Sequence, residues 1–172
     1  PGIEPVRPQV MSVYDLSQYL SWFQSFVKGF YFGTEEDVAN INLKKDHSLR
    51  VLREAGMLTT SLQLPSPLAD VVHIAALLPD VARFPQYRQF KTYNGGYSLN
   101  HACSGVAVMR RADILCRLVP ADRKLVLAAI FLHNRPVLPA RAADHPARVR
   151  GRGRARGSAA GAASRCVSAA CA

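Results

Sequence analysis

Apolar residues recur every three or four positions along most of this chain, and this spacing predicts α-helices rather than strands. The clearest example is residues 15–32, DLSQYLSWFQSFVKGFYF, in which the apolar side chains form one stripe of an amphipathic helix. The stripe consists of Leu16, Tyr19, Leu20, Phe23, Phe26, Val27 and Phe30. No segment of the sequence alternates convincingly between apolar and polar residues, as a half-buried strand would. The pattern therefore predicts an all-α fold in which this stripe faces the core.

Capping residues and prolines divide the rest of the helical region. Thr34 and Asp37 have the spacing of a capping box, which predicts a second helical segment from there to about residue 62, with a break near Asn42. The sequence LPSP then ends that segment, and Pro67 fits the first turn of a third helix. Residues 84–97 are predicted to form a loop. Two further helices are predicted, at residues 98–118 and 121–134.

The two ends of the chain differ in composition from the region between them. Residues 136–172 contain seven arginines and one aspartate, and so carry +6 of the formal charge of +10. They consist mainly of Ala, Arg, Gly, Ser and Pro and contain no aromatic residue, a composition that does not form a core. We expect residues 140–172 to be disordered, and the proline-rich residues 1–11 to be an extended leader with Met11 as the natural start. The remaining segment, 12–139, has the length of a single domain.

Two classes of protein are disfavoured by the sequence. It has no apolar run of about eighteen residues or more and no secretory signal, so we expect no membrane span and a cytoplasmic location. The cysteines contain no CxxC pair, which suits reduced thiols better than a disulfide framework. They are Cys103, Cys116, Cys166 and Cys171.

Four short motifs each contain a histidine or an aspartate that could bind a metal. His47 lies in LKKDHSLRV, Asp80 in AALLPDVARFPQY, His101 in SLNHACSG and His133 in FLHNRPVLP. In this order, and with RFPQYRQFKTY following Asp80, the motifs resemble those of small bacterial members of the HD-domain superfamily of metal-dependent phosphohydrolases. The resemblance covers roughly residues 12–139 and implies an HD-domain-like helical bundle.

The resemblance also implies a metal site and a phosphate-ester substrate. Imidazoles and a carboxylate on separate helices can hold a divalent transition metal, which lowers the pKa of a bound water so that it can attack a phosphoester. The implied metal ligands are His47, Asp80, His101 and His133, and Asp80 is also implied in catalysis. The cofactor would be a divalent ion, among Mn, Fe, Mg, Zn and Ni. The substrate would be a nucleotide or another small phosphate ester.

Two basic residues have the spacing to assist at such a site. Lys44 lies three residues before His47, and Arg83 lies three residues after Asp80, so each can share a helix face with its neighbour. Both are candidates to bind the substrate phosphate. The alternatives are a solvated charge for Lys44 and a local salt bridge to Asp80 for Arg83. His73 is about 10 Å from Asp80 along a helix, at about 1.5 Å per residue, and is not expected to bind the same ion.

The sequence departs from the family pattern in two places. Where the family has the histidine of its His-Asp pair, this chain has Pro79, which offers no ligand. A proline inside a helix would clash with the carbonyl of Ala75 at a cost of about 3 kcal/mol or more, unless the helix ends at Leu78 instead.

The second departure concerns the end of the family pattern. The helix that carries the final metal aspartate of the family has no counterpart, and the only later acidic residue, Asp144, lies in an unrelated context. We expect the HD-type domain to be incomplete at its C-terminal end, as a frameshift near Leu138 would explain.

Two functions are therefore open. The first is an HD-type metal-dependent phosphohydrolase that is impaired because expected metal ligands are missing, so that its status as an enzyme is undecided. The second is a non-catalytic remnant that binds an anion, or nucleic acid through its arginine-rich tail by charge alone. Because the tail has no aromatic residue to stack on bases, such binding would be nonspecific and sensitive to salt.

Overall fold

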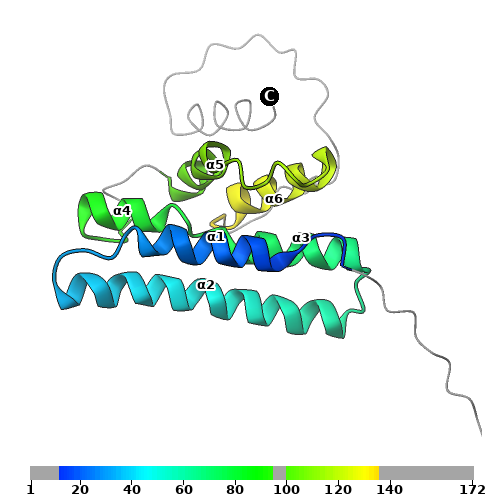
Figure 1. Ribbon diagram of the computed structural model, residues 1–172, viewed down its shortest axis with the longest axis horizontal. Coiled ribbons are helices and arrows are strands. Elements are labelled where there is room, and N and C mark those ends of the chain that lie inside the picture. Colours follow the sequence, from blue (N-terminus) through cyan, green and yellow to red (C-terminus); the bar gives the residue numbers. More distant parts are fainter. Residues whose placement is uncertain (1–11, 95–99, 136–172) are drawn as a thin grey trace, which may run out of the picture.

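The computed structural model describes residues 12–94 and 100–135, and in these ranges it contains six helices and no strand (Figure 1). The predicted all-α fold is confirmed. The predicted leader and the predicted disordered tail lie outside the described residues. No helix in the described ranges is long and apolar enough to cross a membrane.

Helix α3 (Ser66–Leu77) is central to the bundle. It packs against α1 (Leu16–Lys28), against α2 (Glu35–Ser61) and against α6 (Pro120–Leu132), while α5 (His101–Ala112) packs against α6. Figure 1 shows α2 along one side of the molecule beside α1 and α3, with α5 and α6 on the opposite side. The turn that follows α3 therefore lies between helices contributed by both halves of the chain.

The first two helices follow the capping signals of the sequence. The N-cap of α1 is Asp15, whose carboxylate accepts a hydrogen bond from Ser17 N. The predicted capping box of α2 is confirmed, because the side chains of Thr34 and Asp37 each accept the other residue's backbone N–H. Gly33, at φ +74°, precedes it, and a Cβ there would overlap the Asp37 carboxylate.

The predicted break near Asn42 is wrong, because α2 runs without interruption from Glu35 to Ser61. Asn42 Oδ1 accepts a hydrogen bond from the hydroxyl of Tyr31 at 2.6 Å. An asparagine disrupts a helix when its side chain competes for nearby backbone groups. Here that oxygen is directed to another segment, so the helix continues.

Helix α3 begins and ends at prolines. Pro67 lies in its first turn as predicted, and the helix ends at Leu77 with Leu78 as its C-cap. Pro79 is thus outside the helix, so the interpretation that it clashes with Ala75 inside a helix is wrong and the alternative, a helix boundary, is confirmed.

The predicted loop at residues 84–97 is wrong in its first half, because Arg83–Phe90 form α4. Pro85 lies in the first turn of α4, where backbone N–H groups have no partner within the helix and a proline is tolerated. Phe84 and Tyr87, three residues apart, are both buried and attach the helix to the bundle.

The core consists of aromatic and aliphatic side chains from all six helices. Phe84 makes edge-on contacts with Phe23 and Phe26 of α1. Besides Phe23 and Phe84, the large side chains that are fully buried include Ile41, Ile74, Leu77, Leu78, Met109, Leu118 and Ile130. Cys103 and Cys116 form no disulfide, as predicted, and the other two cysteines lie outside the described residues.

Candidate metal and phosphate site

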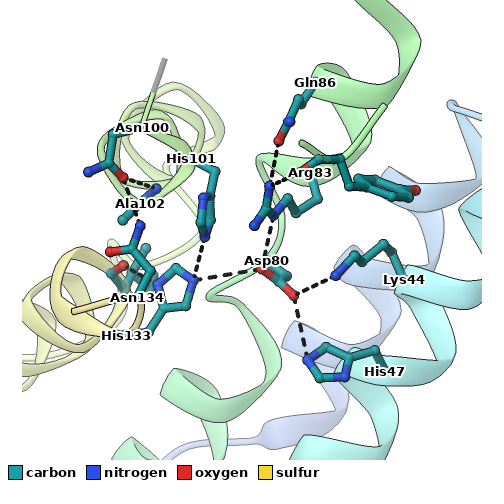
Figure 2. A network of polar contacts seen from close by, with 12 residues as sticks. Lys44, His47, Asp80, Arg83, Gln86, Asn100, His101, Ala102, His133 and Asn134 are labelled. Carbon is teal, nitrogen blue, oxygen red and sulfur yellow. Dashed lines mark hydrogen bonds and ion pairs between the residues drawn. The ribbon is translucent and has the colours of Figure 1, made fainter. Parts of the chain in front are cut away.

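Asp80 lies in the turn between α3 and α4, at the centre of a group of basic side chains (Figure 2). The residue is buried, with 8% of its surface exposed. Its Oδ2 lies 3.7 Å from Lys44 Nζ and 3.6 Å from His47 Nε2. Its Oδ1 lies 3.6 Å from Arg83 Nε and 3.7 Å from His133 Nε2. All four distances exceed that of an ordinary hydrogen bond, so lone pairs of the carboxylate are available to a ligand that enters between these groups.

His101, at the start of α5, and His133, just after α6, form a pair on the Oδ1 side of Asp80. Their Nε2 atoms are 3.0 Å apart, and their rings meet edge to face with centroids 4.9 Å apart. One ligand atom from each of Asp80, His101 and His133 lies within 4.8 Å of the other two. In the part of the chain that the structure describes, this is the one group of three or more histidine, cysteine or acidic side chains with such spacing.

Hydrogen bonds outside the group hold the two histidines in place. Asn100 is the N-cap of α5, and its Oδ1 accepts hydrogen bonds from Ala102 N and from Asn134 Nδ2, both at 3.0 Å. This amide therefore ties the start of α5 to the end of α6. His133 Nδ1 lies 2.7 Å from the carbonyl of Ile130 and donates to it, which directs Nε2 toward the site.

The charges around Asp80 favour its ionised form. Burial alone would raise its pKa, but the contact with His133 and the positive charges of Lys44 and Arg83 outweigh burial and hold the pKa at about 2. Burial lowers the pKa of His101 to about 4, and the charge of Arg83 acts in the same direction. At neutral pH the site therefore offers a carboxylate and a neutral imidazole, which are the forms that bind metals.

The geometry of the three side chains fits a divalent transition metal. Two nitrogens that each lie about 2.0–2.1 Å from an ion are about 2.8–3.0 Å apart at a right angle and about 3.3–3.4 Å apart at the tetrahedral angle. The two Nε2 atoms are 3.0 Å apart, which corresponds to the right angle. Two imidazoles and one carboxylate are a donor set that such ions accept. Asp80, His101 and His133 could thus hold one ion.

The structure brings together all the site residues expected from the sequence, but on different sides of Asp80. His47 lies on the Oδ2 side of Asp80 and is not part of the three-residue group. Lys44 and Arg83 are largely buried, at 21% and 16% side-chain exposure, so Lys44 is not a freely solvated charge. The alternative given for Arg83, a local salt bridge to Asp80, is present in the structure. His73 lies elsewhere, with its Nε2 2.9 Å from the hydroxyl of Thr59.

Two residues beside the site were missed by sequence reasoning. Gln86 and Tyr93 both contact Arg83, through Gln86 Oε1 and the Tyr93 carbonyl. Both lie in the segment predicted to be a loop. The apolar spacing of Phe84 and Tyr87 was the available signal that part of this segment is helical and faces the core.

A pocket of about 170 Å³ lies between α4 and α5 and borders the site at His101. Its volume is below the range of pockets that enclose a whole drug-sized ligand. Its lining consists of Ala82, Pro85, Gln86, Gln89, Phe90, His101 and Ser104. The pocket has room for part of a small molecule beside the candidate metal position.

No family model, no curated protein and no solved structure matches this chain.

Proposed function

We propose that this chain is an HD-domain-type protein that binds one divalent transition metal ion through Asp80, His101 and His133 and acts weakly on a small phosphate ester. The single observation that carries the proposal is the spacing of these three side chains, whose ligand atoms lie within 4.8 Å of one another around a buried carboxylate. The order of the four sequence motifs supports the same proposal.

The cationic side chains give the proposed site its preference for phosphate. Lys44 and Arg83 carry two permanent positive charges beside the single carboxylate of Asp80. They would bind the phosphoryl oxygens and offset the negative charge that increases during phosphoester cleavage. A bound divalent metal would supply Lewis acidity and would acidify a water molecule. The ester group could extend past His101 into the pocket between α4 and α5.

The proposed activity is weak because the ligand set is small. Pro79 offers no nitrogen where the resembled family has a histidine, and the sequence has no counterpart of the family's final metal aspartate. His47 is on the other side of the Asp80 carboxylate from the histidine pair. One ion with three protein ligands is therefore the proposed state, rather than a closed two-metal site.

The proposal is tested by measuring Mn²⁺ affinity and phosphodiester hydrolysis for the wild-type chain and for Pro79→His. We expect weak hydrolysis by the wild type, and a rise in both metal affinity and turnover when the additional imidazole is present. His73→Ala is the control, because this histidine lies outside the site. Hydrolysis that is independent of added metal, or that is equally fast in the wild type and in Pro79→His, would contradict the proposal of an impaired metal site.

The alternative function is a non-catalytic anion-binding module. One observation favours it: the side chains of a lysine, an arginine and two histidines surround one carboxylate, so positive charge is in excess around Asp80. The test is phosphate binding in the presence of a chelator. Phosphate affinity that is unchanged by metal removal, together with no hydrolysis, would favour this alternative. Nucleic-acid binding through the arginine-rich tail belongs to the same alternative and should weaken steeply with salt.

A further inference from the structure

The segment just after α4 returns to the site and contacts both of its cations. Lys91 is the C-cap of α4 at φ +53°, a left-handed conformation that reverses the chain direction. Its Nζ lies 2.7 Å from Asp37 Oδ1, near the start of α2. This ion pair fixes one end of the segment, so that residues 92–94 run alongside α2 and α4.

The backbone carbonyls of this segment orient Arg83. Nη1 of Arg83 donates to the carbonyl of Tyr93 at 2.8 Å and to Gln86 Oε1 at 2.9 Å. Gln86 is itself fixed, since its Nε2 donates to the carbonyl of Thr92 at 3.2 Å and to that of Asn94 at 3.4 Å. Both hydrogens of Nη1 are thus occupied, and Nε of the same guanidinium lies 3.6 Å from Asp80 Oδ1.

The side chain of Tyr93 supports Lys44. Its hydroxyl donates to the carbonyl of Asn40 at 2.8 Å, one helical turn before Lys44 on α2. Its ring packs on Tyr87 with centroids 4.9 Å apart, and Lys44 Nζ lies over the same ring at 5.2 Å from its centroid. Burial raises the pKa of the Tyr93 phenol well above its usual range, so the hydroxyl stays a donor at every physiological pH.

We infer that Tyr93 is a positioning residue, which holds Lys44 and Arg83 in the arrangement that binds an anion beside Asp80. Its ring restrains Lys44 and its carbonyl restrains Arg83. Its hydroxyl, bonded to α2, holds the ring and the carbonyl in these positions. The inference rests on the proposed function, because the anion that these cations would bind is the substrate phosphate. Without Tyr93, the two long side chains would have to lose more conformational freedom on binding the anion.

The test compares Tyr93→Leu and Tyr93→Phe with a matched control, Tyr31→Leu. Tyr31 also hydrogen-bonds to α2 through its hydroxyl, at Asn42, but takes no part in the contacts around Asp80. The probes are inorganic phosphate and Mn²⁺ alone. We expect Tyr93→Leu to weaken phosphate binding about tenfold, through loss of the cation–π contact and of the backbone restraint, with Mn²⁺ affinity unchanged. Tyr93→Phe keeps the ring under Lys44, so its phosphate affinity should fall less than that of Tyr93→Leu.

Equal effects of Tyr93→Leu and Tyr31→Leu would overturn the inference, because they would indicate general destabilisation. Wild-type phosphate affinity in Tyr93→Leu would also overturn it, as would an equal loss of Mn²⁺ affinity.

A second readout needs no ligand. The NMR signal of the Arg83 Nε–H, assigned through its loss in Arg83→Lys, should exchange slowly with solvent in the wild type and faster in Tyr93→Leu only. Unchanged exchange in Tyr93→Leu would refute the positioning role whatever the phosphate result. If the exchange effect is present and the wild type binds no phosphate, the proposed function fails while the positioning of Arg83 by Tyr93 stands.

Discussion

Two buried aspartates of this protein are placed in opposite ways. Asp37 is saturated by direct contacts: Lys91 Nζ at 2.7 Å, Thr34 N at 3.0 Å and the Tyr87 hydroxyl at 3.3 Å. Asp80 is surrounded by four basic groups that all stay at 3.6–3.7 Å. A carboxylate saturated by direct hydrogen bonds contributes to stability, whereas one with charged groups just beyond hydrogen-bond distance can still accept a ligand. This contrast indicates a structural role for Asp37 and supports the proposal that Asp80 binds a ligand.

The role of Asp37 predicts a pH dependence of stability. Its hydrogen bond to Lys91, with that from Thr34, lowers its pKa in the folded state from 3.8 to about 2. Between these two values the unfolded chain binds more protons than the folded one, so this stabilisation is present above pH 3.8 and is lost as the pH falls toward 2. The measurement is urea unfolding between pH 2.5 and 5. The free energy of unfolding of Asp37→Asn should therefore change less with pH than that of the wild type.

The control for this measurement is Glu54→Gln, which removes an exposed carboxylate from the same helix. It should leave the slope as it is in the wild type. An Asp37→Asn protein with the full wild-type slope would show that the bond to Lys91 has no effect on the titration of this carboxyl.

Pro79 gives a second prediction at this scale. If it distorted a helix, replacing it would stabilise the protein by about 3 kcal/mol. Because α3 ends at Leu77, before the proline, we expect the opposite: Pro79→Ala should lower the free energy of unfolding by about 0.4–1 kcal/mol, since the unfolded chain becomes more flexible. Denaturant unfolding of the wild type and of Pro79→Ala shows whether the substitution lowers or raises the free energy of unfolding. A clear stabilisation of Pro79→Ala would show that the proline strains the native backbone.

At the scale of elements, the candidate site depends on the junction of α5 with α6. Gly105 of α5 lies close to α6, where an added Cβ would be 3.0 Å from Ile130 Cγ2. The Asn100 amide joins the same two helices at the end that carries His101 and His133. The spacing of the two imidazoles is therefore a property of how these helices pack.

Asn100→Ala should loosen that junction. Loss of the N-cap costs about 0.5–2 kcal/mol of stability, and the histidine pair should bind metal less tightly because α5 and α6 are no longer tied together. Asn100→Asp keeps an oxygen that can accept from Ala102 N and Asn134, so its stability and metal affinity should stay close to those of the wild type. Unfolding and Mn²⁺ titration of the three proteins provide the measurement, and unchanged metal affinity in Asn100→Ala would contradict the positioning argument.

Some helices of this protein can be predicted from their own sequence better than others. The boundaries of α2 and α3 follow from local chemistry, because Thr34 with Asp37 and Pro67 act on neighbouring backbone groups. Helix α4 was missed because Pro85 and the glycines that follow suggest a loop, whereas the burial of Phe84 and Tyr87 against other helices decides the structure. Packing between distant segments is not visible in a local pattern.

Across the whole molecule, the candidate site joins four separate parts of the chain. Helix α2 supplies Lys44, the turn after α3 supplies Asp80, and α5 and α6 supply His101 and His133 (Figure 2). Periodicity predicts α2, α3, α5 and α6 but not which of these helices meet, so the grouping could be expected only from the resemblance of the motifs. The division of the basic groups between the two oxygens of Asp80 could not be predicted at all, because it depends on the angle at which the helices meet.

Equilibrium dialysis with Zn²⁺ measures whether Asp80, His101 and His133 bind one divalent metal ion, as we propose. The measurement compares the wild type with the double variant His101→Ala/His133→Ala and with the control His73→Ala. We predict one more bound ion per chain in the wild type and in the control than in the double variant, whose affinity should fall at least about tenfold because the loss of a supporting residue alone can cost that much. Equal Zn²⁺ binding by all three proteins, or none by the wild type, would contradict this proposal.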